Sequence, residues 1–190
     1  ALVIATGFLL VAGGLVTGYR AGLSVPDWPN SFGTNMFLYP LSKMTGGIYY
    51  EHAHRLYGTL VGLGTMLLAI HLWRSDERKW LKWLAVIAVI AVVVQGAMGG
   101  FRVTLAEMRA EGIEISSLSD ETPISVTLAV AHGVFGQLFL GLLVIIALAC
   151  TTTWRQASPV KHPATSTDRP LAVTLLVTLV LQLLLGAMTR

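Results

Sequence analysis

The chain alternates between long runs of apolar residues and short polar segments. Five apolar runs stand out, at about 1–17, 51–73, 81–101, 124–150 and 171–188. About 20 apolar residues in a helix cross the hydrocarbon core of a bilayer, so the first run is short and the fourth has length to spare for tilting. None of the runs alternates as a half-buried strand does, and backbone groups in lipid must be hydrogen bonded internally. The pattern therefore predicts an all-α polytopic membrane bundle of four helices with a fifth transmembrane helix.

Composition supports a membrane protein. Hydrophobic residues make up 54% of the 190 residues and charged residues 12%, and the mean hydropathy is +0.69. A soluble alternative would need several helices that are apolar on every side. The net charge of +3 does not indicate a nucleic-acid partner, because the basic residues cluster between the apolar runs. The single cysteine, Cys150, excludes an intrachain disulfide. The chain starts without methionine inside an apolar run, so we expect it to be part of a longer protein.

The distribution of charge predicts the orientation in the membrane. Basic residues gather in two segments, after the second run and after the fourth: Arg74, Arg78, Lys79, Lys82, Arg155, Lys161 and Arg169. The segment after the third run is mainly acidic, with Glu107, Glu111, Glu114, Asp120 and Glu121 against Arg102 and Arg109. The positive-inside rule places the two basic segments in the cytoplasm and the acidic one outside. The N-terminus is then cytoplasmic, and the start of the second run lies near the outer face.

The second apolar run begins with titratable residues. Charged side chains at membrane depth are costly, so Glu51, His54 and Arg55 suggest a functional site. At helical spacing the three share one face, and Gly58 one turn further on leaves room for a flat ligand. His52 points elsewhere. Two structural alternatives stay open, in which the glutamate complements the dipole at the helix start and the arginine extends to the lipid headgroups.

A second histidine lies inside the fourth run. His132 is followed by glycines at 133 and 136 and lies 18 positions before Cys150, while His54 lies 19 positions before Trp73. At 1.5 Å per residue both are roughly 27–29 Å from the cytoplasmic boundary. Two histidines at one depth, each beside glycine, predict a heme held between two helices. The alternative is a histidine that bonds a neighbouring helix, with glycines that serve close packing. Two further histidines are assigned no role: His71 and His162.

The connection between the first and second runs, residues 19–50, is long for a loop without function. Pro26, Trp28 and Pro29 make it stiff and partly apolar. It serves either as an interfacial aromatic anchor, with Tyr49 and Tyr50 in the same belt, or as a lid over a site that opens outward.

Taken in order, these residues resemble the heme A synthase family. The matching segments cover most of the chain: Gly22-Leu23-Ser24, Pro26-Asp27-Trp28, Glu51-His52-Ala53-His54-Arg55 with Gly58, Gln95-Gly96-Ala97-Met98-Gly99 and Ala131-His132-Gly133. Members have eight spans in two similar halves, each with a histidine pair. The resemblance implies a first heme-binding half at 1–150, a cytoplasmic linker at 151–170 and the first helix of a second half at 171–190. The end of the chain, 186–190, weakly echoes 13–17, as an internal repeat would.

The resemblance also implies an activity and a set of roles. The family oxidises a methyl group of heme O to a formyl group, which gives heme A for terminal oxidases. His54 and His132 would ligate the heme iron, Arg55 would help to bind the cofactor, and Glu51 would be the catalytic carboxylate. Heme B is expected in the second half. The implied partners are heme O, the lipid bilayer, heme O synthase and an electron donor, with a bacterial cell membrane as location and a homo-oligomer left open.

Two other classes of function compete with this enzyme. A bis-histidine membrane electron carrier or heme transporter needs the histidine pair but not Glu51. A purely structural subunit needs neither. The cysteine pair that some family members have in the first external loop is missing here, which excludes a thiol role at that place.

Overall fold

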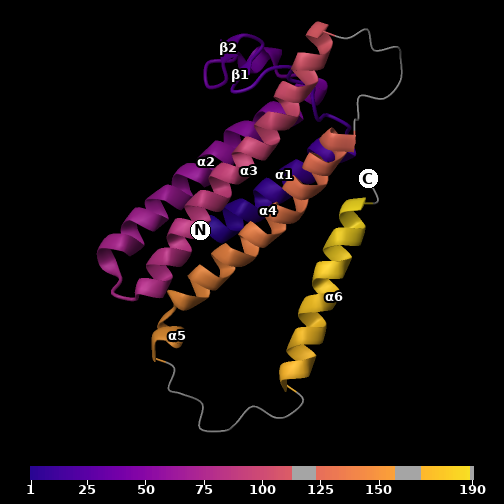
Figure 1. Cartoon of the computed structure of the whole chain (residues 1–190). Coiled ribbons are helices and arrows are strands. Elements are labelled where there is room, and N and C mark those ends of the chain that lie inside the picture. Colours follow the sequence, from indigo (N-terminus) through magenta and orange to yellow (C-terminus); the bar gives the residue numbers. More distant parts are fainter. Residues whose placement is uncertain (113–122, 157–167, 189–190) are drawn as a thin grey trace.

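The computed structural model describes residues 1–112, 123–156 and 168–188, with side chains at 1–106, 124–156 and 168–186. Its helices and strands, in chain order, are α1 Leu2–Gly18, β1 Asn30–Ser31, β2 Thr34–Asn35, the 3-10 helix η1 Leu41–Lys43, α2 Gly46–Ser75, α3 Lys79–Gly112, α4 Pro123–Ala149, α5 Thr152–Gln156 and α6 Asp168–Met188 (Figure 1). Among the described helices α2, α3, α4 and α6 are long and apolar enough to cross a membrane, and α1 is a shorter apolar helix. The predicted all-α membrane bundle is confirmed.

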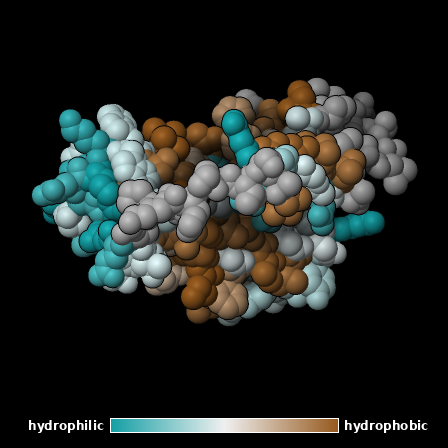
Figure 2. Space-filling view, turned by 90° about the horizontal axis from the view of Figure 1, so that it is seen from below, coloured by the Kyte–Doolittle hydropathy of each residue, from teal (hydrophilic) through white to brown (hydrophobic). Residues whose placement is uncertain are grey.

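Helices α1 to α4 pack together, and α6 lies along α4 at the side of the bundle (Figure 1). The core between α2, α3 and α4 combines small residues with branched ones, such as Ala85 and Ala88 against Leu143 and Ile146. Small side chains let helices approach closely, which is how membrane helices gain packing energy in the absence of a hydrophobic drive. The outer surface is apolar as well: Figure 2 shows a broad patch of hydrophobic residues beside a hydrophilic group at the left of the molecule. Such a surface suits contact with lipid tails.

The two predicted cytoplasmic segments meet at one end of the bundle. Asp76, after the end of α2, accepts hydrogen bonds from Arg78 Nε at 2.9 Å and from Arg155 Nη2 at 3.0 Å. Arg78 also donates to the Ala149 carbonyl at the end of α4, at 2.8 Å. The Arg78 guanidinium and backbone N–H, helped by Arg155, hold the pKa of Asp76 well below its usual range. The ion pairs therefore join the α2–α3 turn to α4 and α5. The acidic side chains expected on the other side, from Glu107 to Glu121, lie outside the described side chains, as do those of Arg109, Lys161 and His162.

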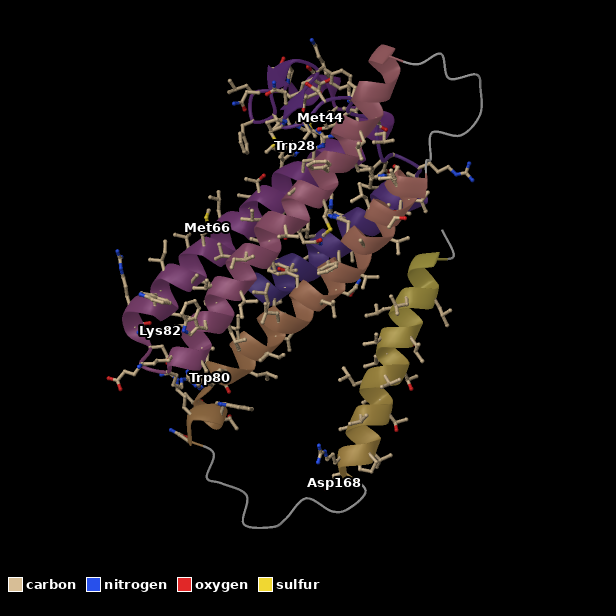
Figure 3. All side chains as sticks on the ribbon, viewed as in Figure 1. Trp28, Met44, Met66, Trp80, Lys82 and Asp168 are labelled. Atoms are coloured by element: carbon tan, nitrogen blue, oxygen red, sulfur yellow. The ribbon has the colours of Figure 1, made fainter. Side chains whose placement is uncertain are left out.

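The opposite end of the bundle carries residues 19–45, which we call the lid segment. Figure 3 labels Trp28 and Met44 at this end, and Trp80 and Lys82 at the other. Strands β1 and β2 pair as an antiparallel hairpin with Phe32 and Gly33 between them, both at positive φ, 53° and 71°. This is the backbone that a two-residue type I′ turn requires. Asp27 stabilises the turn, because its carboxylate accepts the N–H groups of Phe32 at 2.7 Å and Gly33 at 2.8 Å.

The structure refines several predicted boundaries. Helix α2 begins at Gly46 and not at Glu51, and α3 continues to Gly112, well beyond the predicted end at Phe101. The hairpin and the short helix α5 were not predicted. The two boundary shifts, at the start of α2 and the end of α3, lengthen these helices beyond their apolar runs. A membrane helix can extend past its apolar run where the residues at its end find partners.

Candidate functional site

A cavity of about 860 Å³ lies between the helices, and residues of the lid segment form part of its wall. Five helices and the lid contribute to its wall, among others through Gly13 of α1, His54 of α2, Gly99 of α3, His132 of α4 and Leu183 of α6. A cavity of this size and mainly apolar lining is typical of sites for small molecules and cofactors.

The two predicted ligands face each other across this cavity. The ring centroids of His54 and His132 are 6.3 Å apart, and the ring planes are nearly perpendicular, at 78°. Two imidazoles that ligate one metal ion from opposite sides have their nitrogens about 4 Å apart, twice a metal–nitrogen distance of about 2 Å. A ring centroid lies behind the ring nitrogen, so the centroids of such a pair are further apart than the nitrogens, and 6.3 Å between centroids leaves room for one metal ion between the rings. The depth count from the sequence placed both rings at one level, and the structure brings them together.

Space for these rings comes from glycines on neighbouring helices. A Cβ atom at Gly13 of α1 would lie 3.0 Å from His54 Cε1, and one at Gly99 of α3 would lie 3.6 Å from His132 Cε1. The glycine expected to clear the face of the second run, Gly58, also lines the cavity, but its neighbour is Leu9, 3.9 Å from the Cβ position. The sequence therefore indicated glycine-cleared rings, but not which glycines clear them.

Polar atoms around the rings fit a metal-bound ligand. His54 Nδ1 is buried, and no described residue gives it a hydrogen-bond partner. Gln95 donates from Nε2 to the His132 carbonyl at 3.0 Å, while its buried Oε1 has no hydrogen-bond partner within the described part of the chain. Buried polar atoms are nearly always satisfied, so an orphaned imidazole nitrogen on a cavity wall points to a ligand. Within the described residues no cluster of three or more metal-binding side chains forms. A pair of histidines is one way in which proteins hold heme iron.

Glu51 and Arg55 connect the cavity wall to the lid segment. Glu51 Oε1 accepts from Arg55 Nη2 at 2.6 Å, and Oε2 accepts the backbone N–H of Val25 at 3.0 Å. Arg55 also donates to three lid carbonyls, those of Asp27 at 2.7 Å, Val25 at 3.0 Å and Asn30 at 3.2 Å. Glu51 is only 6% exposed, and both side chains line the cavity.

This geometry decides between the alternatives left open for the two residues. Helix α2 begins at Gly46 after its N-cap Thr45, so Glu51 lies beyond the first turn and does not cap the helix. Arg55 points into the lid segment and not to the headgroups. The lid segment itself covers the cavity, since Trp28, Pro29 and Met36 line it. Tyr49 is 53% exposed, as expected for the aromatic belt.

Two other described histidines, His52 and His71, do not line the cavity. His52 is fully buried under the lid segment, where its Nδ1 lies 3.0 Å from Ser31 Oγ and its ring packs against Tyr39. As predicted, it points in a different direction from His54. His71 is exposed near the end of α2.

Arg102 is a wall residue that the sequence reasoning missed. It was counted among the charges of the external segment, but it lies within α3 and on the cavity wall. The missed signal is its position directly after Gly99-Gly100-Phe101. Gly99 faces the His132 ring and Gly100 leaves the space that the Trp28 indole fills, so the next turn of α3 faces the same cavity.

Fold and site together define a multi-pass membrane protein with a lidded cavity between two half-buried histidines. The profile of the COX15-CtaA family, described as cytochrome oxidase assembly protein, matches residues 1–190. The chain therefore belongs to this family, which comprises the heme A synthases, and the resemblance found in the sequence is confirmed. It has a role in cytochrome oxidase assembly. No curated protein matches the chain. No solved structure matches it either.

Proposed function

We propose that the chain binds heme O between His54 and His132 and oxidises one of its methyl groups to a formyl group, giving heme A. The observation that carries the proposal is the pair of imidazole rings 6.3 Å apart across a cavity of about 860 Å³, in a member of this family. Bound heme would supply the iron and the oxidisable methyl group. The chain's own residues hold the ligand, exclude water and handle protons and charge at the ring edge.

His54 and His132 are the proposed iron ligands. Gln95 holds the backbone of α4 at His132 through its carbonyl, which fixes the position of that ring relative to α3. Such outer contacts orient metal ligands and affect their affinity. Gly13 and Gly99 leave space beside the two rings, so both rings can contact the same ligand between the helices.

Glu51 is the proposed catalytic carboxylate. It lies on the cavity wall one helical turn from His54, so it would lie nearer to the edge of a bound ring than to the iron. Oxidation of the methyl carbon releases protons and develops positive charge, which a carboxylate accepts or stabilises. Arg55 and the Val25 N–H position this carboxylate, and Arg55 adds positive charge near the anionic groups of a bound cofactor.

The finer cellular assignments are part of the same proposal. The basic end of the bundle, at Arg78 and Arg155, faces the cytoplasm of a bacterial cell, so the cavity opens near the outer face. Residues 1–150 form the first heme-binding half, 151–170 a cytoplasmic linker and 171–190 the first helix of a second half, where heme B is expected. Heme O synthase supplies the substrate, and a separate electron-transfer partner completes the reaction.

The ligands are tested by exchanging single histidines in the membrane-embedded protein. His54→Ala and His132→Ala should each abolish or markedly change the heme absorption spectrum, whereas His71→Ala, at an exposed position on the same helix as His54, should leave it unchanged. Unchanged spectra in both of the first two variants would disprove the shared-ligand site.

The variant Glu51→Gln distinguishes an enzyme from a heme carrier. This change keeps the side-chain volume and the acceptor for Val25 but removes the carboxylate. Loss of acid–base or electrostatic assistance should slow heme A formation by roughly 10²- to 10⁴-fold, with heme still bound and heme O accumulating. Chromatographic separation of hemes O and A measures this outcome. Normal heme A output from this variant would instead favour a bis-histidine electron carrier or heme transporter.

A further inference from the structure

The end of the bundle opposite the lid segment carries an aromatic cluster at the α2–α3 turn. Trp73 of α2 and Trp83 of α3 contact each other edge to face, with ring centroids 6.1 Å apart. The two residues are 49% and 59% exposed. Lys82, labelled in Figure 3, places its Nζ atom over the Trp73 ring, 5.8 Å from the ring centroid. An ammonium group at this distance is attracted to the face of an indole, so the contact fixes the position of the lysine charge.

The charge of Lys82 is not neutralised by the carboxylates at this turn. Asp76 is paired with Arg78 at 2.8 Å, so the charge of that arginine is compensated within the turn. Glu77, the other carboxylate of the turn, forms no ion pair among the described residues, and neither does Lys82. Lys82 therefore presents a positioned positive charge beside two exposed indole rings.

Each tryptophan lies at the end of a row of exposed apolar side chains that are 49–57% exposed: Ile70 on α2, and Ile87 and Ile90 on α3. Ile70 comes one turn before its tryptophan, and the two α3 residues follow theirs by one and two turns, which keeps each row on one helix face. Since α2 and α3 pack together and the two indoles touch, both rows start at the same place. The α3 row covers seven residues, or about 10 Å, which fits within a leaflet of about 15 Å.

We propose that this surface binds one anionic phospholipid, with the lipid phosphate at Lys82 and the acyl chains along the two apolar rows. Indole rings suit the headgroup level of a bilayer, and a lysine at that level attracts a negatively charged headgroup. Arg74 and Lys79, which are exposed at the same turn, add to the positive potential. Neither Lys82 nor the two tryptophans line the cavity, so this lipid site is independent of the proposed heme site.

Native mass spectrometry of the detergent-solubilised protein, with equal amounts of phosphatidylglycerol and phosphatidylcholine, tests the site. The wild-type protein should retain phosphatidylglycerol preferentially. Lys82→Gln should weaken phosphatidylglycerol binding by about five-fold, the effect of one basic residue near an anionic membrane surface, and Lys82→Arg should preserve it. The matched control is Lys43→Gln, which removes the same charge from an exposed position in the lid segment and should bind as wild type does.

A second variant tests the aromatic support without removing the charge. Trp73→Leu keeps an apolar side chain but removes the ring beneath the ammonium group, so it should also weaken phosphatidylglycerol binding. Unchanged binding in Lys82→Gln or in Trp73→Leu, or an equal loss in Lys43→Gln, would overturn the proposed site. Inorganic phosphate should not displace the lipid, because it lacks the acyl chains. Displacement by inorganic phosphate would indicate a site for free phosphate and would equally overturn the proposal.

Discussion

Replacing Arg55 by methionine should release the lid segment from the cavity. The substitution keeps an unbranched apolar side chain but removes four hydrogen bonds, to Glu51 and to three lid carbonyls. It also leaves the carboxylate of Glu51 without its cation. This carboxylate is largely buried, since the side chain of Glu51 is 8% exposed and that of Arg55 is 11% exposed. Removing one partner of a buried ion pair costs about 3–5 kcal/mol, because the other charge stays buried without compensation. We expect the free energy of lid opening to fall by this amount.

Trypsin cleavage after Lys43 measures that opening. Lys43 lies in the short helix η1 of the lid segment, and cleavage within a folded element requires local unfolding. When opening and closing are fast relative to cleavage, the cleavage rate follows the population of the open form. A cost of about 3–5 kcal/mol therefore predicts cleavage faster by about 10²- to 10⁴-fold in Arg55→Met. Arg74→Met, which also removes one arginine from α2, should cleave at the wild-type rate.

The double variant Glu51→Gln/Arg55→Met separates the stranded charge from the lost lid contacts. Glutamine still accepts the N–H of Val25, and no carboxylate is left unpaired, so the double variant should cleave more slowly than Arg55→Met alone. Equal rates for Arg55→Met and Arg74→Met, or faster cleavage in the double variant than in Arg55→Met, would refute the reasoning.

Three further predictions follow from other parts of the structure. Gly13→Ala should displace the His54 ring and weaken heme binding in an absorbance titration, whereas Gly7→Ala, whose Cβ position meets no atom within 4 Å, should not. Because the hydrogen bonds of Arg78 lower the pKa of Asp76, its stabilising contribution is complete at neutral pH and is lost as the pH falls below about 4. Asp76→Asn should therefore lower the thermal midpoint at pH 7. The difference in thermal midpoint between variant and wild type should become smaller as the pH falls. In intact cells Ser75→Cys, in a background without the native cysteine, should resist a membrane-impermeant thiol reagent, while a cysteine in the lid segment should react.

The sequence predicted the helices and the histidine pair well, because both depend on regular spacing. Apolar runs determine where membrane helices lie, and a rise of 1.5 Å per residue converts position along a run into depth. His54 and His132 could therefore be matched in height from the numbering alone. Which helix supplies the glycine beneath each ring depends on how the helices pack, and Gly13 and Gly99 could not be assigned from periodicity.

Two features could not be predicted from the sequence, each for its own reason. The hairpin of the lid segment has Phe32 at positive φ, a backbone conformation unusual for a bulky residue, and it is held by Asp27 five residues earlier. Arg102 was assigned to a loop because hydropathy falls at the first charge after an apolar run. Helix α3 continues past it, since Ser125 of α4 provides a buried partner for the guanidinium.

The lid segment and the cavity form one energetic unit. Glu51 and Arg55 lie inside a membrane helix, where charges are costly unless they are paired and hydrogen bonded. Four of their five mutual and lid hydrogen bonds come from the backbone of the lid segment, at Val25, Asp27 and Asn30. Opening the lid therefore removes these hydrogen bonds from both charged groups at the same time as it opens the site. The same contacts that close the cavity position the carboxylate on its wall, so a ligand that stabilises the closed lid also stabilises the arrangement of Glu51 beside His54.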